Sequence, residues 1–238
     1  MKNKHKPYGP YEKYFKRSID LICGLAAVIV FSWLYVILII LGTIFMRGNP
    51  FFTQERPGKD GKVFKLIKFR TMDNRKDKNG DLLPDEVRLN RYGRFLRATS
   101  LDELPEAFNI IKGDMSVVGP RPLVVRYLPF YTDEEKHRHD IRPGLSGWAQ
   151  VNGRNFLSWE EKFQLDVEYV NHVTFLFDLK IIFMSAMKLF NHSDVEDATT
   201  IVEDENNIKW CYVGHQKHRC YDAFDVERKR QMSRNQGE

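Results

Sequence analysis

Residues 21–46 read LICGLAAVIVFSWLYVILIILGTIFM, and this apolar stretch decides the fold of the chain. No charged side chain interrupts it from Leu21 to Met46. A helix needs about 20 apolar residues to cross a bilayer, so the stretch is long enough to do so. Two arrangements remain open at this point: an ordinary spanning helix, and a segment that enters the membrane, bends and returns to the same face.

Basic residues stand on both sides of the apolar stretch. Those before it are Lys2, Lys4, Lys6, Lys13, Lys16 and Arg17, and those after it are Arg47, Arg56, Lys59, Lys62, Lys65, Lys68 and Arg70. Positive flanks favour the cytoplasmic side of a membrane, and a single crossing would leave one flank outside. The charges therefore favour the re-entrant arrangement, with a bend near Ser32, whose hydroxyl group can hydrogen-bond back to a helix carbonyl.

The composition limits the class of protein. With 238 residues the chain fits one domain with appendages, and its three scattered cysteines predict a reducing compartment rather than a disulfide framework. The net charge of +5 predicts an anionic partner, such as lipid headgroups or phosphorylated substrates. We do not expect a nucleic acid partner, because the basic residues are mixed with acids and membrane signals and form no aromatic-basic binding module.

Hydrophobic periodicity and turn residues predict the elements after the apolar stretch. Phe51–Gln54 and Val63–Phe69 read as strands of a small β-hairpin, with a turn at 57–61. The predicted helices are Glu86–Arg97, Ser100–Ile111, Thr132–His139 and Trp159–Val170, with Phe175–Phe190 as an apolar helix in the membrane interface or the core. We expect loops at Asp73–Asp85 and at the glycine-rich Arg142–Arg154, and we expect His137 and His139 to lie on a solvated face.

Two adjacent acids, Asp102 and Glu103, stand in the segment TSLDELPE at residues 99–106. One interpretation is structural, because Ser100 and Glu103 form a capping-box pattern and acids in a first helical turn complement the helix dipole. The other interpretation is chemical. An ionised aspartate can attack phosphorus and form an acyl phosphate, and a second carboxylate can hold Mg²⁺ together with a substrate phosphate.

Basic side chains in the neighbouring segments favour the chemical interpretation. Their donor groups match phosphate oxygens, and guanidinium groups do so in pairs. These residues are Lys68, Arg70, Arg97, Arg121, Arg142 and Arg154. Two acids among such cations, downstream of a membrane segment, suit phosphate chemistry on a lipid carrier.

Several ordered motifs over residues 14–191 resemble the monotopic phosphoglycosyl transferases, the bacterial sugar transferase type that starts glycan assembly. The motifs are KYFKR (13–17) with Asp20, FTQERPG (52–58), FKLIKFRTM (64–72), SLDELP (100–105), GDMSVVGPRP (113–122), RPGLSGWAQVNGR (142–154) and LDVEYV (165–170). One departure stands in the membrane segment. The family's re-entrant helix usually breaks at Ser-Pro, whereas here Trp33 follows Ser32.

The resemblance implies a two-step exchange. The aspartate matching Asp102 attacks the β-phosphate of a UDP-sugar, and UMP leaves. Polyprenyl phosphate then takes the phosphosugar from the enzyme, which gives polyprenyl-diphosphate-sugar. The family's Mg²⁺ ligand matches Glu103, and its acid near the site, whose role stays open, matches Asp166. Its substrate-contacting basic positions match Lys68, Arg97, Arg121 and Arg154.

The resemblance also implies an architecture and a location. We expect an α/β, membrane-embedded monotopic catalytic domain with one N-terminal re-entrant helix, a small β-hairpin and interfacial helices. Its parts would be a basic segment (1–12), the re-entrant helix (13–47), the catalytic domain (48–191) and a C-terminal tail (192–238). The domain would face the cytoplasm at the inner leaflet, and its product would start polysaccharide or glycoconjugate assembly by downstream glycosyltransferases.

Three other interpretations stay open. The first is a membrane-tethered nucleotide-sugar phosphodiesterase, in which water replaces the lipid acceptor. The second is an inactive scaffold for a polysaccharide-assembly complex. The third concerns the tail, where Cys211, His215, His218 and Cys220 have a residue set that suits tetrahedral Zn²⁺, although the last spacing is tight and a solvated or partner-binding tail is the simpler expectation.

Overall fold

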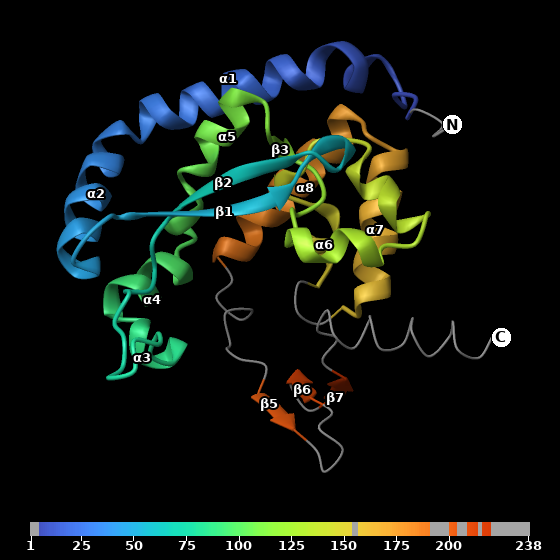
Figure 1. Cartoon of the computed structure of the whole chain (residues 1–238). Helices are drawn as coiled ribbons and strands as arrows, with labels where there is room; N and C mark the ends of the chain where they lie inside the picture. The colour runs from blue at the N-terminus through green and yellow to red at the C-terminus, as the bar shows by residue number, and fades with distance from the viewer. Residues whose placement is uncertain (1–4, 154–156, 191–199, 204–208, 214–215, 220–238) are drawn as a thin grey trace.

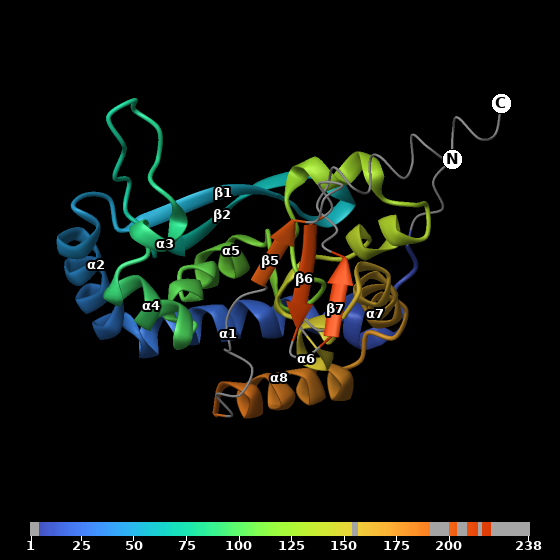
Figure 2. The same ribbon diagram turned by 90° about the horizontal axis from the view of Figure 1, so that it is seen from below.

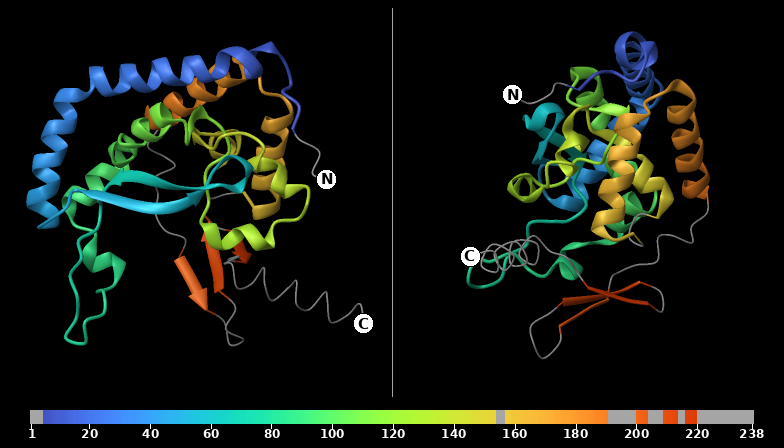
Figure 3. Two further views of the ribbon diagram at one scale, coloured as in Figure 1. Left: turned by 45° about the horizontal axis from the view of Figure 1, so that its top comes forward. Right: turned by 90° about the vertical axis from the view of Figure 1, so that its right-hand side faces the viewer.

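The computed structural model describes residues 5–153, 157–190, 200–203, 209–213 and 216–219. Its helices pack around two small two-stranded sheets, and a separate three-stranded sheet lies outside them (Figure 1). The predicted mixed α/β class is confirmed. The apolar stretch forms the most prominent feature, a bent helical arm along the outside of the molecule (Figures 1 and 3).

The arm consists of a short π-helix η1 (Tyr11–Phe15), α1 (Lys16–Val30) and α2 (Ser32–Met46). The two α-helices bend by 64° at Phe31, whose φ of −94° and ψ of 12° leave the helical range. The bend therefore forms without a proline, one residue before Ser32. Among the described residues, no single helix has the length and apolar character of a membrane span, but this bent pair has both when taken together.

Three charged residues of α1 attach the arm to the rest of the molecule. Lys16 donates to Asp178 of α8 at 2.6 Å, and the Asp20 carboxylate accepts from Ser116 at 2.7 Å. Arg17 donates to two carbonyl groups at the end of α5, at 2.6 and 2.8 Å. The lysine, arginine and aspartate of this part of the sequence thus form buried or half-buried contacts, and do not simply set the charge of a membrane flank.

The predicted β-hairpin is confirmed. Strands β1 (Phe51–Pro57) and β2 (Val63–Phe69) pair antiparallel around the 3₁₀ turn η2 (Lys59–Gly61), with Phe51 opposite Phe69. Helix α5 lies between the hairpin and α1 in two views (Figures 1 and 2). The hairpin therefore connects to the arm through the helix that follows the Asp102–Glu103 pair.

The prediction of one helix over Glu86–Arg97 is wrong. The chain forms two helices, α3 (Asp85–Arg88) and α4 (Arg91–Ala98), after a loop at 73–84. Leu89 is extended, and the Asn90 side chain accepts the backbone N–H of Gly93 at 2.9 Å. Asparagine at an N-cap satisfies an otherwise unpaired helix donor, so a new helix begins at this point.

The predicted helix start at Ser100, with its capping box, is also wrong. Ser100 lies in the left-handed region at a φ of 54°, and its side chain caps nothing. A 3₁₀ turn, η3 (Leu101–Glu103), follows, and α5 (Glu106–Lys112) begins only after Pro105. The Glu103 carboxylate turns instead to basic groups of the site described below.

Two predictions for the middle of the chain are only partly correct. The predicted loop at Arg142–Arg154 contains a strand and a helix, and the predicted helix at Thr132–His139 is only a short turn. Strands β3 (Ser116–Val118) and β4 (Gly144–Ser146) pair in parallel, and α6 (Trp148–Asn152) follows, so much of the glycine-rich segment is ordered. The charged segment forms only a 3₁₀ turn, η5 (Glu135–His139), after a similar turn, η4 (Val125–Phe130).

Two long helices complete the body of the molecule. Helix α7 (Trp159–Asn171) confirms the prediction and begins with a true capping box between Ser158 and Glu161. Helix α8 (Phe175–Phe190) exposes large apolar side chains such as Leu176. Strands β5 (Thr200–Glu203), β6 (Lys209–Val213) and β7 (Gln216–Arg219) form a separate antiparallel sheet.

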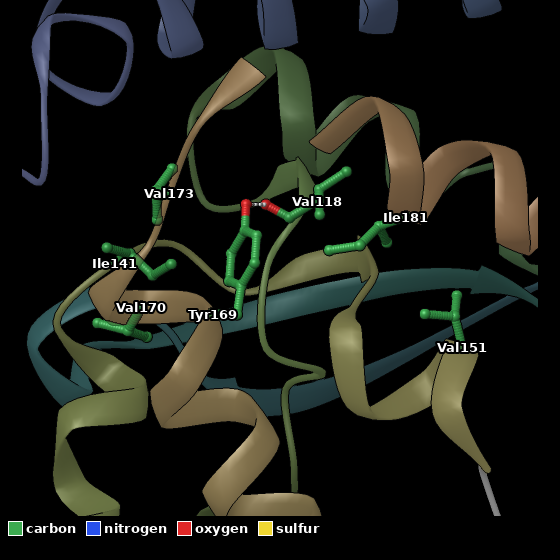
Figure 4. Packing of buried hydrophobic residues seen from close by; sticks show 7 residues of the cluster. All are labelled: Val118, Ile141, Val151, Tyr169, Val170, Val173 and Ile181. Atoms are coloured by element: carbon green, nitrogen blue, oxygen red, sulfur yellow. Dashed lines mark hydrogen bonds between the residues drawn. The ribbon is translucent and has the colours of Figure 1, made fainter. Parts of the chain in front are cut away.

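A compact core joins the parallel strands to α7 and α8 (Figure 4). Its fully packed members are Val118, Ile141, Val151, Tyr169, Val170, Val173 and Ile181. The single proton of the Tyr169 hydroxyl group is shared between Asp178, at 2.5 Å, and the more distant carbonyl of Val118, at 3.2 Å. Since Asp178 also accepts from Lys16, the arm and the core share one buried polar network.

Candidate active site

The Asp102–Glu103 pair lies on η3, next to the hairpin strand β2. Lys68 of β2 donates to Oε1 of Glu103 at 2.7 Å, and Arg121 donates to the same oxygen at 3.0 Å. Burial alone would raise the pKa of Glu103, but the charges of Arg121 and Lys68 outweigh burial and lower it to about 2. Glu103 is therefore ionised at neutral pH and binds both cations.

Asp102 differs from its neighbour. Among the described residues no side-chain ion pair reaches its carboxylate, although it lines the same pocket as Lys68 and Arg121. Burial, followed by the charge of Glu103, raises the pKa of Asp102, while Lys68 opposes the shift. A half-buried carboxylate without a side-chain partner suits a nucleophile, because no bond must break before it attacks.

The pocket has a volume of about 430 Å³. It brings together six of the residues that the sequence singled out, namely Lys68, Arg97, Asp102, Glu103, Arg121 and Asp166. Arg154 lies outside the described residues. Arg70 and Arg142 do not line the pocket, and Arg142 instead donates to the carbonyl of Gly113 at 2.8 Å. The interpretation of these two arginines as phosphate-binding groups is therefore not supported.

Close backbone packing positions Arg121. A Cβ atom at Gly119 would lie 2.4 Å from the carbonyl oxygen of Arg142, so only glycine fits where the two strands meet. Pro120 follows and directs the chain out of β3. The Arg121 backbone carbonyl accepts from Arg138 at 2.8 Å, which fixes the segment from a second side.

Asp166 and Arg138 form a buried ion pair. Both residues are only 3 % exposed, and the two guanidinium nitrogens Nη2 and Nε lie 2.7 and 3.1 Å from Oδ2 of Asp166. Burial raises the pKa of Asp166, and the charge of Arg138 opposes that shift. The role that the sequence left open for Asp166 is thus in part to hold Arg138, and through it the Arg121 segment.

The burial of Arg138 was not predicted from the sequence. This residue stands within the charged run of η5, where no apolar period separates a buried residue from solvated ones. The expectation of a solvated face is correct for His137, which is exposed, but wrong for His139, which is buried. The sequence analysis also did not predict that α7 lines the pocket. The helix contributes Trp159, Lys162 and Phe163, which lie on one of its faces.

Glu106 is a further acid that the sequence did not single out. It is 3 % exposed, and its Oε1 lies 3.1 Å from Nζ of Lys68, which is also the partner of Glu103. Burial raises the pKa of Glu106 to about 7; Lys68 opposes the shift, and the charge of Glu103 adds to it. The lysine is thus shared between two carboxylates.

The free energy of unfolding should reflect this shifted pKa. A raised pKa means that folded Glu106 keeps a proton that the unfolded chain releases, so the stabilisation is complete below the ordinary pKa of 4.5 and is lost as the pH rises to about 7. Glu106→Gln cannot titrate and should lack this fall. Denaturant unfolding of both proteins at about pH 5 and about pH 8 measures the difference, and an equal pH dependence would contradict the assignment.

The site has the residues that a magnesium ion requires but not a closed metal site. Mg²⁺ usually binds through one or two carboxylates plus substrate phosphates, and Glu103 supplies such a carboxylate beside Asp102. No group of three or more His, Cys, Asp or Glu side chains converges within the described part of the chain. In the tail, Cys211 and His218 are register partners on β6 and β7, while His215 and Cys220 lie outside the described residues, so the zinc hypothesis stays a prediction.

Comparisons with known proteins identify related sequences. A family model described as bacterial sugar transferase matches residues 11–192, which include every pocket residue named above. The chain is 46% identical over 188 residues to the uncharacterized sugar transferase EpsL of Bacillus subtilis, a match that covers 79% of this chain and 90% of that protein.

Two further relatives have more specific names. The chain is 36% identical over 185 residues to the exopolysaccharide production protein ExoY of Rhizobium meliloti, covering 71% of this chain and 82% of that protein. It is 35% identical over 194 residues to the UDP-glucose:undecaprenyl-phosphate glucose-1-phosphate transferase of Klebsiella pneumoniae, covering 77% of this chain but 42% of that protein. The chain therefore spans less than half of the latter relative.

Proposed function

This chain belongs to the bacterial sugar transferase family, and we propose that it transfers a phosphosugar from a UDP-sugar to polyprenyl (undecaprenyl) phosphate, with release of UMP. The observation that carries the proposal is the Asp102 carboxylate, which has no side-chain salt bridge among the described residues and shares one pocket with Lys68, Arg97 and Arg121. The activity in the name of the Klebsiella relative supports the same donor and acceptor classes. The name of ExoY supports a role in starting exopolysaccharide assembly, whose later steps require downstream glycosyltransferases.

The proposed reaction is a double displacement at phosphorus. A carboxylate oxygen of Asp102 attacks the β-phosphorus of the UDP-sugar, the bond from that phosphorus to the bridging oxygen breaks, and UMP leaves with the electron pair. An oxygen of polyprenyl phosphate then attacks the phosphosugar on Asp102. The acyl phosphate bond breaks, and Asp102 returns to its ionised form.

The remaining pocket residues would bind and orient the phosphates. Lys68, Arg97 and Arg121 supply positive charge where negative charge develops on the phosphorus oxygens, and such fixed donors stabilise a transition state without reorganising. Glu103 would be the ligand of Mg²⁺, which when bound neutralises the diphosphate of the donor. Arg154 is proposed as a further substrate contact, and Asp166 acts on the site through Arg138.

The location of the acceptor supports a membrane-bound arrangement. We propose that the bent arm α1–α2 enters the cytoplasmic leaflet and returns, and that part of α8 lies in the interface. The outward side chains of the arm are large and apolar, for example Ile29 at 71 % and Trp33 at 62 % exposure. Such exposed apolar surface suits lipid rather than water. A soluble donor and a lipid phosphate would then meet at headgroup level.

The topology is tested by cysteine labelling in a variant without the native cysteines. Single cysteines placed at Lys4 and Lys59 should both be protected from an impermeant thiol reagent in intact cells, because both flanks of a re-entrant arm stay in the cytoplasm. Both should react after the cells are opened. Labelling of only one of them in intact cells would mean that the arm crosses the membrane.

The proposed function is tested by UMP release from a panel of UDP-sugars with Mg²⁺, with and without polyprenyl phosphate. Sustained release that requires the lipid phosphate would support the transferase and identify the sugar. Sustained release without it would favour a nucleotide-sugar phosphodiesterase. An absence of release with every sugar would contradict the proposal and favour the scaffold interpretation.

A further inference from the structure

Glu106 is a buried acid at the active site that has no part in the proposed exchange. It is the first residue of α5, three positions after Glu103, and only 3 % of its surface is exposed. Burying a carboxylate is unfavourable unless a cation or hydrogen-bond donors compensate it. Among the described residues, the cation in salt-bridge contact with Glu106 is Lys68, at 3.1 Å.

Hydrogen bonds between α5 and β2 hold Glu106 and Lys68 next to each other. Asn109, one helical turn after Glu106, accepts the backbone N–H of Ile67 at 3.0 Å and donates to the carbonyl of Lys65 at 2.8 Å. These two bonds attach α5 to β2 at the strand positions just before Lys68. The contact is therefore built into the packing of two elements and does not depend on a flexible surface pair.

Lys68 has two carboxylate partners, whereas Glu103 has two cationic ones. Lys68 and Arg121 both donate to Oε1 of Glu103, at 2.7 and 3.0 Å. A carboxylate that becomes a metal ligand must share or give up such donors, because a cation repels them. Lys68 would then lose its shorter ion pair at the moment when it is required at the phosphates.

We propose that Glu106 is a positioning residue that retains Lys68 at the reacting phosphates when Glu103 turns to a divalent cation carried in with the donor. This inference rests on the proposed function and deepens it. The two acids then have different roles. Glu103 binds the metal ion that accompanies the donor, and Glu106 holds Lys68 in place. In metal sites, side chains that orient the metal-binding residues without touching the metal are also important. Their removal typically lowers metal affinity or activity by about 10–100-fold.

The test measures donor binding and not turnover. All proteins carry Asp102→Asn, so that the donor binds without reacting, and binding of the UDP-sugar identified above is followed by calorimetry over a Mg²⁺ titration. The titration is run at about pH 8, above the Glu106 pKa of about 7, so that the carboxylate is ionised. Glu106→Gln keeps the shape and an acceptor oxygen but removes that charge. In this variant Lys68 depends on Glu103 alone, so the Mg²⁺ concentration for half-maximal donor binding should rise by about 10-fold.

A matched control variant and a double-mutant cycle between Glu106 and Lys68 test whether Glu106 acts by positioning Lys68 or only by stabilising the fold. Asp85→Asn removes an exposed acid of α3, whose salt-bridge partner is Arg88 of the same helix, and should leave the Mg²⁺ requirement unchanged within about twofold. In a Lys68→Met background, Glu106→Gln should have no further effect, because the group that it positions is gone. Glu106→Ala, which lacks the acceptor oxygen, should shift the requirement further than Glu106→Gln.

The outcomes distinguish the inference from the function on which it rests. An unchanged Mg²⁺ requirement in Glu106→Gln, or an equal shift with and without Lys68, would overturn the inference and leave the proposed function intact. If the parent protein with Glu106 bound the donor equally well without Mg²⁺, the inference would fail and the transfer reaction would stand. If it bound no UDP-sugar at all, the proposed function would fail and the inference with it.

Discussion

Asp102→Asn is expected to lower the rate of UMP release by at least about 10³-fold, the scale seen when an enzyme loses its nucleophile. Asparagine has nearly the same shape but offers no carboxylate oxygen to form an acyl phosphate. The neighbouring Glu103 cannot take over the attack, because Lys68 and Arg121 already engage its carboxylate. Release of UMP from the identified UDP-sugar, with Mg²⁺ and polyprenyl phosphate present, measures the effect.

The control for this prediction is Asp114→Asn, the same chemical change at an acid outside the pocket. It should keep nearly full activity. If Asp102→Asn retained a tenth or more of the wild-type rate while folding normally, Asp102 would not be the nucleophile. The pocket would then use Glu103 or direct attack by the lipid phosphate.

Arg138→Met is expected to destabilise the protein by about 3–5 kcal/mol, because it leaves Asp166 buried without its cation. The two residues are each 3 % exposed, so water cannot compensate the charge that remains. The change also removes the donor to the Arg121 carbonyl. Denaturant unfolding in detergent measures the loss.

Two comparisons make this prediction specific. Arg138→Met combined with Asp166→Leu removes both charges and should recover much of the stability, since a buried pair can often be replaced by apolar groups. Lys136→Met disrupts an exposed ion pair with Asp133 on the same turn and should have little measurable effect. A loss in Arg138→Met no larger than in Lys136→Met would contradict the account.

Local sequence predicted the elements whose signals are local. The hairpin follows from strand residues around a glycine turn, and α7 follows from its apolar period and the Ser158 cap. The chemical interpretation of Asp102 and Glu103 came from their setting among basic motifs. The structure brings Lys68, Arg97 and Arg121 together with the two acids in one pocket.

The errors arose where a distant partner decides the local conformation. Ser100 and Glu103 match a capping box, but Glu103 finds stronger charged partners in Lys68 and Arg121, which lie far away in sequence. Arg138 is buried because Asp166 of α7 pairs with it. Such pairings depend on tertiary packing and leave no periodic signal in either segment.

The most direct test of the central claim is to look for the phosphosugar on the protein. The purified enzyme is incubated with the UDP-sugar and Mg²⁺ but without the lipid acceptor, and is then analysed by intact-mass and peptide mass spectrometry. The account predicts a gain of one phosphosugar on the peptide that contains Asp102, accompanied by one equivalent of UMP and removed when polyprenyl phosphate is added. UMP release that occurs only with the acceptor present, with no adduct at any stage, would contradict a covalent intermediate on Asp102.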